Sequence, residues 1–144
     1  KGVFTNYDVK NKKKITVPSI TNYFILFADL KNQSINKKII KNLKNHNQNE
    51  KYLFSSIKPN YGKFEEKRYW RGPVWINCNW IIYQGLKNKD KKFANKIKEK
   101  TINLIKKKGF YEYYSFKTGE AFGASNFSWT ASLFLDFILE KKYN

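Results

Sequence analysis

One stretch decides the fold: Tyr69-Trp70-Arg71-Gly72-Pro73-Val74-Trp75-Ile76-Asn77-Cys78-Asn79-Trp80. Three of the four tryptophans of the chain and its single cysteine fall within these twelve residues. Proline is favoured in the first turn of a helix, so we expect a helix to start at Pro73. From Val74 to Leu86 the residues are apolar on nearly all sides, which is typical of a buried helix. Asn77 and Asn79 interrupt the run and need hydrogen-bonding partners, and Gly85 permits another helix to approach.

Two helices are expected before this stretch. Residues 16–30 carry apolar side chains at three- and four-residue spacing and predict a helix that is buried on most sides. Residues 35–43 carry a narrow apolar stripe with lysines outside it, which predicts an outer helix with a wet face. Ser34 is the expected N-cap of that second helix.

Two further helices are expected after it. Residues 91–108 predict another outer helix, capped by Asp90 and ended by Gly109. Residues 127–141 predict a final helix with apolar side chains including Trp129. Inner and outer helices therefore alternate along the chain, which predicts an all-α fold of about five helices. An (α/α)6 toroid requires this alternation, and the chain supplies about two and a half of its six hairpins.

The remaining segments are expected to be loops. Residues 46–68 form a long stretch without periodicity, and long ordered loops are often functional. Residues 110–125 form an aromatic loop with Gly119 and Gly123 as turn points. His46 stands among Asn and Lys residues at the end of a helix and is expected on the surface.

Composition excludes several functional classes. The net charge of the 144 residues is +18, but 27 of the 29 basic residues are lysine, whereas nucleic-acid readers rely on arginine. A solvated lysine coat is therefore favoured over a specific nucleic-acid surface. One cysteine and one histidine exclude a disulfide framework and the usual zinc sites. Neither a membrane span nor a signal-peptide pattern is present, and Lys, Asn and Ile usage suits an AT-rich genome, so we expect a cytoplasmic bacterial protein.

Glu112 is the candidate for acid–base chemistry. It lies between Tyr111, Tyr113 and Tyr114, whose rings limit water and whose phenols can orient a carboxylate. From the residues by themselves, an alternative stays open: Glu112 pairs with Arg71 or a lysine, and the tyrosines are core.

Four segments carry a resemblance to a known family: Tyr69 to Trp80, Gly109 to Tyr114, Thr118-Gly119-Glu120 and Asn126 to Ala131. Together they resemble the C-terminal part of the inverting glycosidases of glycoside hydrolase family 63. The nearest likeness is to mannosylglycerate and glucosylglycerate hydrolases. The resemblance covers roughly residues 2 to 140, and it implies that residues 1–144 are a C-terminal fragment of one (α/α)6-barrel glycosidase domain.

The resemblance also implies roles for residues. Inverting glycosidases use a general acid and a general base on opposite faces of the scissile bond. The family's base maps onto Glu112. The sugar-lining aromatic residues map onto Tyr69, Trp70, Trp75 and Trp129. Glu120 is expected to hold its loop or contact substrate, and it is the rival for the base.

Two side chains are expected to support the site. Arg71 is expected to hold a carboxylate in place, and Tyr113 to orient Glu112. No metal or organic cofactor is implied, because two carboxylates and a water suffice.

The chain departs from the family pattern at the general acid. The family's acid is an aspartate upstream of these segments, and the four aspartates here, Asp8, Asp29, Asp90 and Asp136, stand in other contexts. We therefore expect the partners to be a small glycoside and the missing N-terminal half of the barrel, with no membrane and no specific nucleic acid. The 144-residue chain by itself is expected to be inactive. The alternatives are a basic, aromatic-rich binding module for nucleic acid and a carbohydrate-binding remnant without catalysis.

Overall fold

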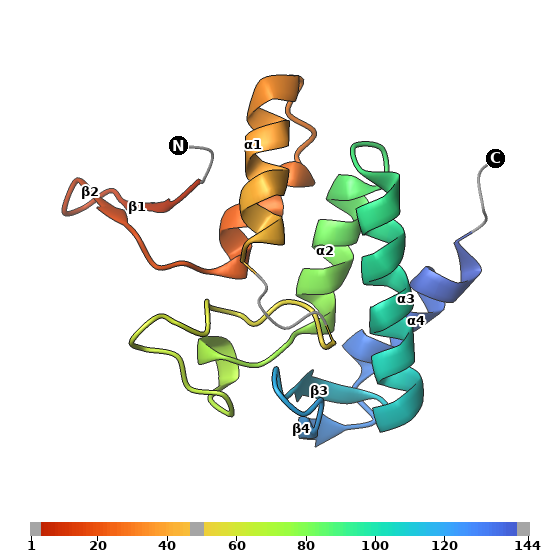
Figure 1. Cartoon of the computed structure of the whole chain (residues 1–144). Helices are drawn as coiled ribbons and strands as arrows, with labels where there is room; N and C mark the ends of the chain where they lie inside the picture. Colours follow the sequence, from red (N-terminus) through yellow and green to blue (C-terminus); the bar gives the residue numbers. More distant parts are fainter. Residues whose placement is uncertain (1–3, 47–50, 141–144) are drawn as a thin grey trace.

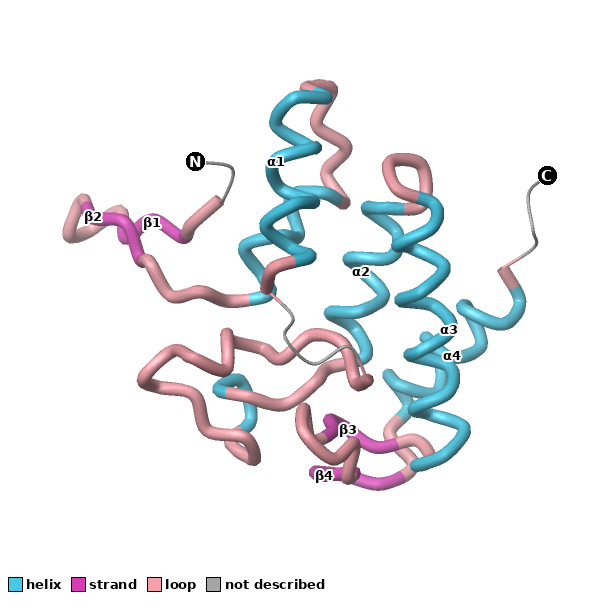
Figure 2. The backbone as a smooth tube through the Cα atoms, viewed as in Figure 1, coloured by secondary structure: helices cyan, strands magenta, loops and turns pink. Residues whose placement is uncertain are grey.

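The computed structural model describes residues 4–46 and 51–140. Helices dominate it, with two short hairpins at its edges (Figures 1 and 2). In chain order the elements are β1 (Asn6–Asp8), β2 (Lys13–Ile15), the 3-10 helix η1 (Ile20–Leu26), α1 (Gln33–Lys44), the 3-10 turn η2 (Tyr69–Arg71), α2 (Ile76–Leu86), α3 (Lys91–Lys108), β3 (Tyr111–Tyr114), β4 (Ala121–Ser125) and α4 (Ser128–Leu139).

Helix α2 is the centre of the fold. It packs against η1, α3 and α4, and in Figure 1 it lies between α1 and α3. The predicted burial is confirmed, since Ile82 and Leu86 are fully buried. Asn79 donates to Thr101 Oγ1 at 3.1 Å. A Cβ on Gly85 would stand 2.7 Å from the backbone of Phe27, so glycine permits the close approach of η1.

The predicted start of this helix at Pro73 is wrong. Val74 exchanges backbone hydrogen bonds with Tyr114, at 2.8 and 3.0 Å, and Pro73 O accepts from Ser56 N at 3.0 Å. These contacts hold residues 73–75 extended, and the helix begins at Ile76. A tertiary β-bridge thus overrides the local preference of proline for a first helical turn.

The two outer helices form as predicted, with one cap displaced. Asp90 Oδ1 accepts from Phe93 N and caps α3, which ends at Gly109 in the left-handed region of φ. Helix α1 is capped by Asn32, whose Oδ1 accepts from Ile35 N, and not by Ser34. Both residue types are good caps, so the sequence pattern did not distinguish them.

The expected helix over residues 16–30 is shorter than predicted. Ser19 forms a β-bridge with Ile57, and Ile20 N donates to Ser56 O at 3.0 Å, so the segment before Ile20 is extended. Ser19 Oγ then accepts from Thr21 N and opens η1.

His46 is buried, so its predicted surface position is wrong. Its side chain is 1% exposed, its Nε2 lies 3.2 Å from Ser55 O, and its ring packs edge-on to Tyr23 at 5.3 Å. Desolvation lowers its pKa to about 4, although the Ser55 carbonyl opposes the shift. The segment around Ser55 lies against His46, and a local sequence pattern cannot reveal that tertiary contact.

The predicted all-α class is correct only in part. The expected aromatic loop over residues 110–125 is a hairpin, with Tyr113 paired to Phe122 and Tyr114 to Ala121. Gly119 and Gly123 have φ of +71° and +75°, which suits a tight turn and a bulge. A second hairpin, β1–β2, lies at the N-terminal end.

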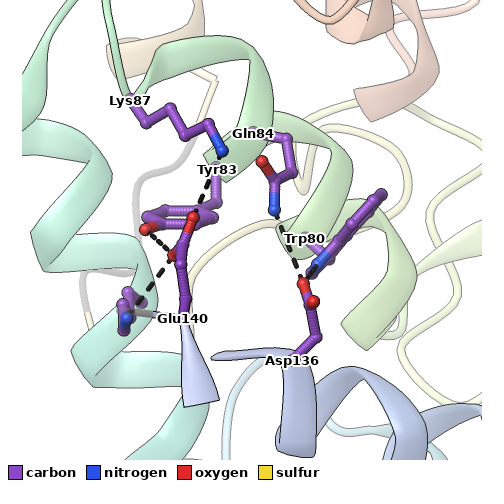
Figure 3. A network of polar contacts seen from close by, with 7 residues as sticks. Trp80, Tyr83, Gln84, Lys87, Asp136 and Glu140 are labelled. Atoms are coloured by element: carbon purple, nitrogen blue, oxygen red, sulfur yellow. Dashed lines mark hydrogen bonds and ion pairs between the residues drawn. The ribbon is translucent and has the colours of Figure 1, made fainter. Parts of the chain in front are cut away.

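Helix α4 is tied to its neighbours by two carboxylates (Figure 3). Glu140 accepts from the Tyr83 phenol and pairs with Lys87 and Lys98, and Asp136 accepts from Trp80 Nε1. Burial raises the pKa of Glu140, but these donors outweigh it and the pKa is lowered. None of the described helices is both long and apolar enough to cross a membrane.

Candidate active site

An aromatic stack connects the loop before α2 to the hairpin. The Trp70 and Trp75 indoles stack at 4.1 Å with an interplanar angle of 5°, and Tyr113 packs on Trp75 at 5.1 Å. Tyr69 stands edge-on to Trp75 at 4.9 Å, and Tyr69 O accepts from Trp75 Nε1. Trp75 is 3% exposed, whereas Tyr69 and Trp70 are 49% and 40% exposed. The solvent-facing members of the stack are therefore Tyr69 and Trp70, with Trp75 fixing them from within.

Glu112 lies on β3, opposite a bulge in β4. Between the pairs Tyr111–Ser125 and Tyr113–Phe122, Glu112 faces two residues, Gly123 and Ala124. Bulges of this kind re-aim side chains next to active sites.

The bulge holds the Glu112 carboxylate. Ala124 N donates to Glu112 Oε2 at 3.3 Å, and a Cβ on Gly123 would stand 2.5 Å from the same oxygen. The Tyr69 phenol faces this carboxylate, and partial desolvation together with the Glu112 charge raises the pKa of Tyr69. Tyr69 therefore keeps its proton and can donate it to Glu112 in a hydrogen bond.

Glu112 lines a narrow cleft between the hairpin and α4, which in this chain by itself leaves no room for a water molecule. The lining residues are Trp75, Ile76, Asn77, Glu112, Phe127, Trp129, Thr130 and Leu133. Backbone and side-chain bonds join the two walls, since Thr130 Oγ1 donates to Tyr111 O at 2.7 Å and Phe127 N donates to Phe110 O at 3.0 Å. Trp129 is 48% exposed at the rim. The structure thus brings Glu112, Trp75 and Trp129 together, although they are distant in sequence.

Sequence analysis missed several residues of the cleft: Ile76, Asn77, Phe127, Thr130 and Leu133. Asn77 could have been identified from the sequence, because it is a polar residue within an apolar run. Its Oδ1 is buried and accepts no hydrogen bond from the described part of the chain. A buried acceptor of this kind calls for a donor from a ligand or another segment.

Arg71 and Glu120 lie outside the cleft. Arg71 contacts Glu65 at 2.8 Å, and Glu65 also contacts Arg68. Arg71 therefore holds a carboxylate, but that carboxylate is Glu65, and the alternative pairing of Arg71 with Glu112 is not observed. Glu120 stands at the exposed end of the hairpin, 3.9 Å from Lys67 Nζ.

The cleft offers one carboxylate among the described residues, Glu112. The four aspartates are engaged elsewhere: Asp8 binds Asn11, Asp29 pairs with Lys31 and Lys89, Asp90 caps α3, and Asp136 accepts from Trp80. Within residues 4–46 and 51–140 no group of three His, Cys, Asp or Glu side chains is placed to hold a metal ion.

A larger hollow of about 630 Å³ lies between α1 and α3, away from Glu112. Its lining includes Lys44, Asp90 and Phe93. Asp90 is occupied by its cap and by Lys44 at 2.7 Å, and Lys44 also stands over the Phe93 ring. Glu99 also lines the hollow, but none of the lining residues belongs to the segments 69–80, 109–114, 118–120 and 126–131 that carry the family resemblance.

Known proteins share both the sequence and the fold. Mannosylglycerate hydrolase of Thermus thermophilus is 33% identical over 135 residues, which are 93% of this chain and 32% of that protein. Glucosylglycerate hydrolase of Mycolicibacterium hassiacum is 31% identical over 87 residues, 60% of this chain and 20% of that protein.

Two solved structures have a fold similar to that of this chain. The GH63 mannosylglycerate hydrolase of Thermus thermophilus in complex with Tris superposes with a TM-score of 0.88 at 33% identity, covering 95% of this chain and 33% of that one. A neutral trehalase of Saccharomyces cerevisiae matches at 14% identity with a TM-score of 0.65, covering 99% of this chain and 27% of that one, which is a likeness of fold.

The chain thus spans about a third of the length of its Thermus relatives. The model of the mannosylglycerate hydrolase MGH1-like glycoside hydrolase domain matches residues 1–130, which is most of the chain. By this match and the Thermus likeness, the chain belongs to the family of mannosylglycerate hydrolase MGH1-like glycoside hydrolases.

Proposed function

We propose that this chain supplies the general base and part of the sugar site of an inverting α-glycosidase. The substrate is a small α-mannoside or α-glucoside of a glycerate-like acid. Relatives named mannosylglycerate hydrolase and glucosylglycerate hydrolase support that class. One solved relative is described in complex with Tris and D-glycerate. The net charge of +18 suits an anionic aglycone.

The observation that carries the proposal is the setting of Glu112. Its carboxylate is partly buried, is held at Oε2 by Ala124 N, and lines the same narrow cleft as Trp75 and Trp129. Indole faces such as that of Trp129 offer a platform on which the apolar face of a sugar ring packs. A carboxylate fixed beside such a platform is placed to accept a proton from a water near the anomeric carbon.

Two carboxyl groups account for both proton transfers of the reaction. Glu112 takes one proton from a water, whose oxygen forms a bond to the anomeric carbon. The glycosidic C–O bond breaks on the opposite face, and the leaving oxygen takes a proton from a carboxylic acid outside the described residues. In inverting enzymes the two carboxyl groups stand roughly 6.5–9.5 Å apart, which leaves room for the water.

The architecture of the proposal is an (α/α)6 toroid, of which this chain forms the C-terminal part. The inner helix α2, the outer helices α1 and α3 and the trehalase likeness support it. The other part brings the acid, so the 144-residue chain by itself is expected to give no turnover. A cytoplasmic location in a bacterium stays a prediction.

The test uses the complete natural polypeptide that carries this chain, called the complete polypeptide below. It is incubated with mannosylglycerate and glucosylglycerate, and the first-formed sugar anomer is followed by proton NMR. We expect the β-anomer to appear first from an α-glycoside. A first-formed α-anomer contradicts inversion, and absence of hydrolysis of every α-glycoside tried contradicts the proposal as a whole.

Carbohydrate binding without catalysis is the second candidate. It is favoured by one observation, that a single carboxylate lines the cleft among the described residues. Saturable binding of mannosylglycerate by the complete polypeptide, with no release of mannose, indicates this candidate.

A further inference from the structure

Two side-chain hydroxyls hold the backbone at the start of β3. The phenol of Tyr114 accepts a hydrogen bond from Tyr111 N at 3.1 Å and donates one to Gly109 O at 2.7 Å. The Thr130 hydroxyl, which belongs to α4, donates to Tyr111 O at 2.7 Å. Both backbone polar groups of Tyr111, the residue before Glu112, are therefore bonded to side-chain hydroxyls.

The two hydroxyls are fixed in place by the surrounding fold. Tyr114 and Thr130 are both buried. The backbone of Tyr114 exchanges hydrogen bonds with Val74, and Phe127 N, directly before α4, donates to Phe110 O at 3.0 Å. Burial raises the pKa of Tyr114, so its phenol keeps the proton that it donates. Because a buried backbone group that loses its partner destabilises the fold, these bonds are strongly favoured.

The bonds lie where the strand ladder is interrupted. The bulge falls between Tyr111 and Tyr113, so Glu112 has no single partner residue on β4. A bulge disrupts the ladder locally, and the neighbouring strand then fixes the direction of a side chain less firmly. The peptide group is planar and includes the next Cα atom, so holding Tyr111 O also fixes the Cα of Glu112. The Thr130 bond thus replaces, beside Glu112, the control that the ladder lacks.

Thr130 also connects the carboxylate to the aromatic rim of the cleft. It directly follows Trp129 in α4, and Trp129, Thr130 and Glu112 all line the cleft. One hydrogen bond therefore joins the residue after the indole to the residue before the carboxylate. This bond sets how far the indole of Trp129 stands from the carboxylate of Glu112.

We propose that Thr130 and Tyr114 are positioning residues, whose hydroxyls hold the backbone of Tyr111 so that Glu112 stands at the correct distance from a sugar packed on Trp129. In this role each hydroxyl acts through the backbone and not by touching substrate. The inference rests on the proposed function, because the placement of Glu112 affects the rate only where Glu112 is the general base.

The test begins with Thr130→Val in the complete polypeptide, which removes the hydroxyl and keeps the branched shape of the side chain. We expect kcat to fall by roughly 10- to 100-fold with KM changed less than about threefold, because a displacement approaching 1 Å costs up to about 100-fold in rate. Thr130→Ser keeps the hydroxyl and should restore most of kcat. Ser132→Ala is the matched control, because Ser132 Oγ donates within α4 to Ser128 O at 2.8 Å, and it should leave kcat unchanged.

Tyr114→Phe is the second variant, and it decides the inference where Thr130→Val does not fold. It removes the phenol oxygen that bridges Tyr111 N and Gly109 O, and kcat should again fall by at least about tenfold. Tyr23→Phe is its matched control, since Tyr23 is also buried and its phenol donates to Asn42 O at 3.3 Å, far along the chain from Glu112. Equal losses in the two tyrosine variants overturn the inference.

A double-mutant cycle separates positioning from a general structural role. In a Glu112→Ala background, turnover is supported by azide, a nucleophile that needs no base, so no base is left to position. Adding Thr130→Val to that background should change azide-supported turnover by less than about threefold. The same fall of tenfold or more in both backgrounds overturns the inference, because the hydroxyl then acts on more than Glu112.

The failure of the inference is distinguishable from that of the proposed function. Hydrolysis that is absent in the native polypeptide, or that survives Glu112→Ala, overturns the proposed base and the inference with it. A Glu112-dependent hydrolase that tolerates both Thr130→Val and Tyr114→Phe, with kcat within about threefold of the native value, overturns the inference and leaves the proposed function standing.

Discussion

Replacing Gly123 by alanine should displace the candidate base while leaving the fold in place. Gly123 has a φ of +75°, and a Cβ there would stand 2.5 Å from Glu112 Oε2 and 2.7 Å from Glu112 Cβ. Ordinary contact begins at 3.4 Å, so the carboxylate oxygen must retreat by about 0.9 Å. That movement breaks its hydrogen bond with Ala124 N, which is 3.3 Å long in the native structure.

The size of the effect follows from this displacement. A misplacement of about 1 Å in a catalytic group costs roughly 100-fold in rate, which corresponds to about 2.7 kcal/mol of activation free energy. The left-handed φ adds about 1 kcal/mol of strain to the folded state. Because the exposed aromatic residues Trp70 and Trp129 are untouched, the KM of the complete polypeptide should change by less than about threefold.

The assay is steady-state hydrolysis of mannosylglycerate or glucosylglycerate by the complete polypeptide. Gly62→Ala is the matched control, since a Cβ at Gly62 meets nothing within 4 Å. We expect Gly123→Ala to lower kcat by about 100-fold and Gly62→Ala to leave it unchanged. A Gly123→Ala variant with kcat within threefold of the native value refutes the positioning of Glu112 by the bulge.

Three further predictions concern stability and the site. The pKa of His46 is about 4 in the folded chain and about 6.5 in the unfolded chain, so between these pH values the unfolded chain binds more protons. The free energy of unfolding should therefore fall by about 3 kcal/mol as the pH is lowered from 6.5 to 4, which urea unfolding measures. A His46→Gln variant should lack this part of the pH dependence. Gly85→Ala should lower the free energy of unfolding by about 1–3 kcal/mol or more, because its Cβ meets η1 backbone at 2.7 Å; thermal unfolding checks this, and an unchanged midpoint contradicts the close packing. Tyr69→Phe removes the phenol that faces Glu112 and should lower kcat by roughly one order of magnitude, with unchanged circular dichroism; an unchanged kcat contradicts a role for that phenol beside the carboxylate.

Helices with a strong period were predictable from sequence. Helix α3 followed from its amphipathic pattern, the Asp90 cap and Gly109, all of which act within a few residues. The burial of α2 could be predicted from an apolar run that lacks a polar, solvent-exposed face. Its first residue did not, because the backbone of Val74 pairs with Tyr114, forty residues away.

The site was predictable in its residues but not in its geometry. The Tyr-Glu-Tyr-Tyr segment is too short and too uniformly aromatic to show a two-residue period, so the β3–β4 hairpin was interpreted as a loop. The placement of Glu112 beside Trp129 depends on the bulge and on the Thr130–Tyr111 bond, which join distant segments. Burial of His46 under the segment around Ser55 is non-local in the same way.

The assignment of Glu112 as general base is tested most directly by comparing Glu112→Ala with Glu120→Ala in the complete polypeptide. Glu120 is the matched control, because it is exposed and stands outside the cleft. We predict that Glu112→Ala lowers kcat by about 1,000-fold or more, since it removes the proton acceptor, and that added azide, which needs no base, restores turnover as a glycosyl azide of inverted configuration. Glu120→Ala is predicted to stay within about tenfold of the native kcat. A loss of several orders of magnitude with Glu120→Ala, while Glu112→Ala remains active, contradicts the account.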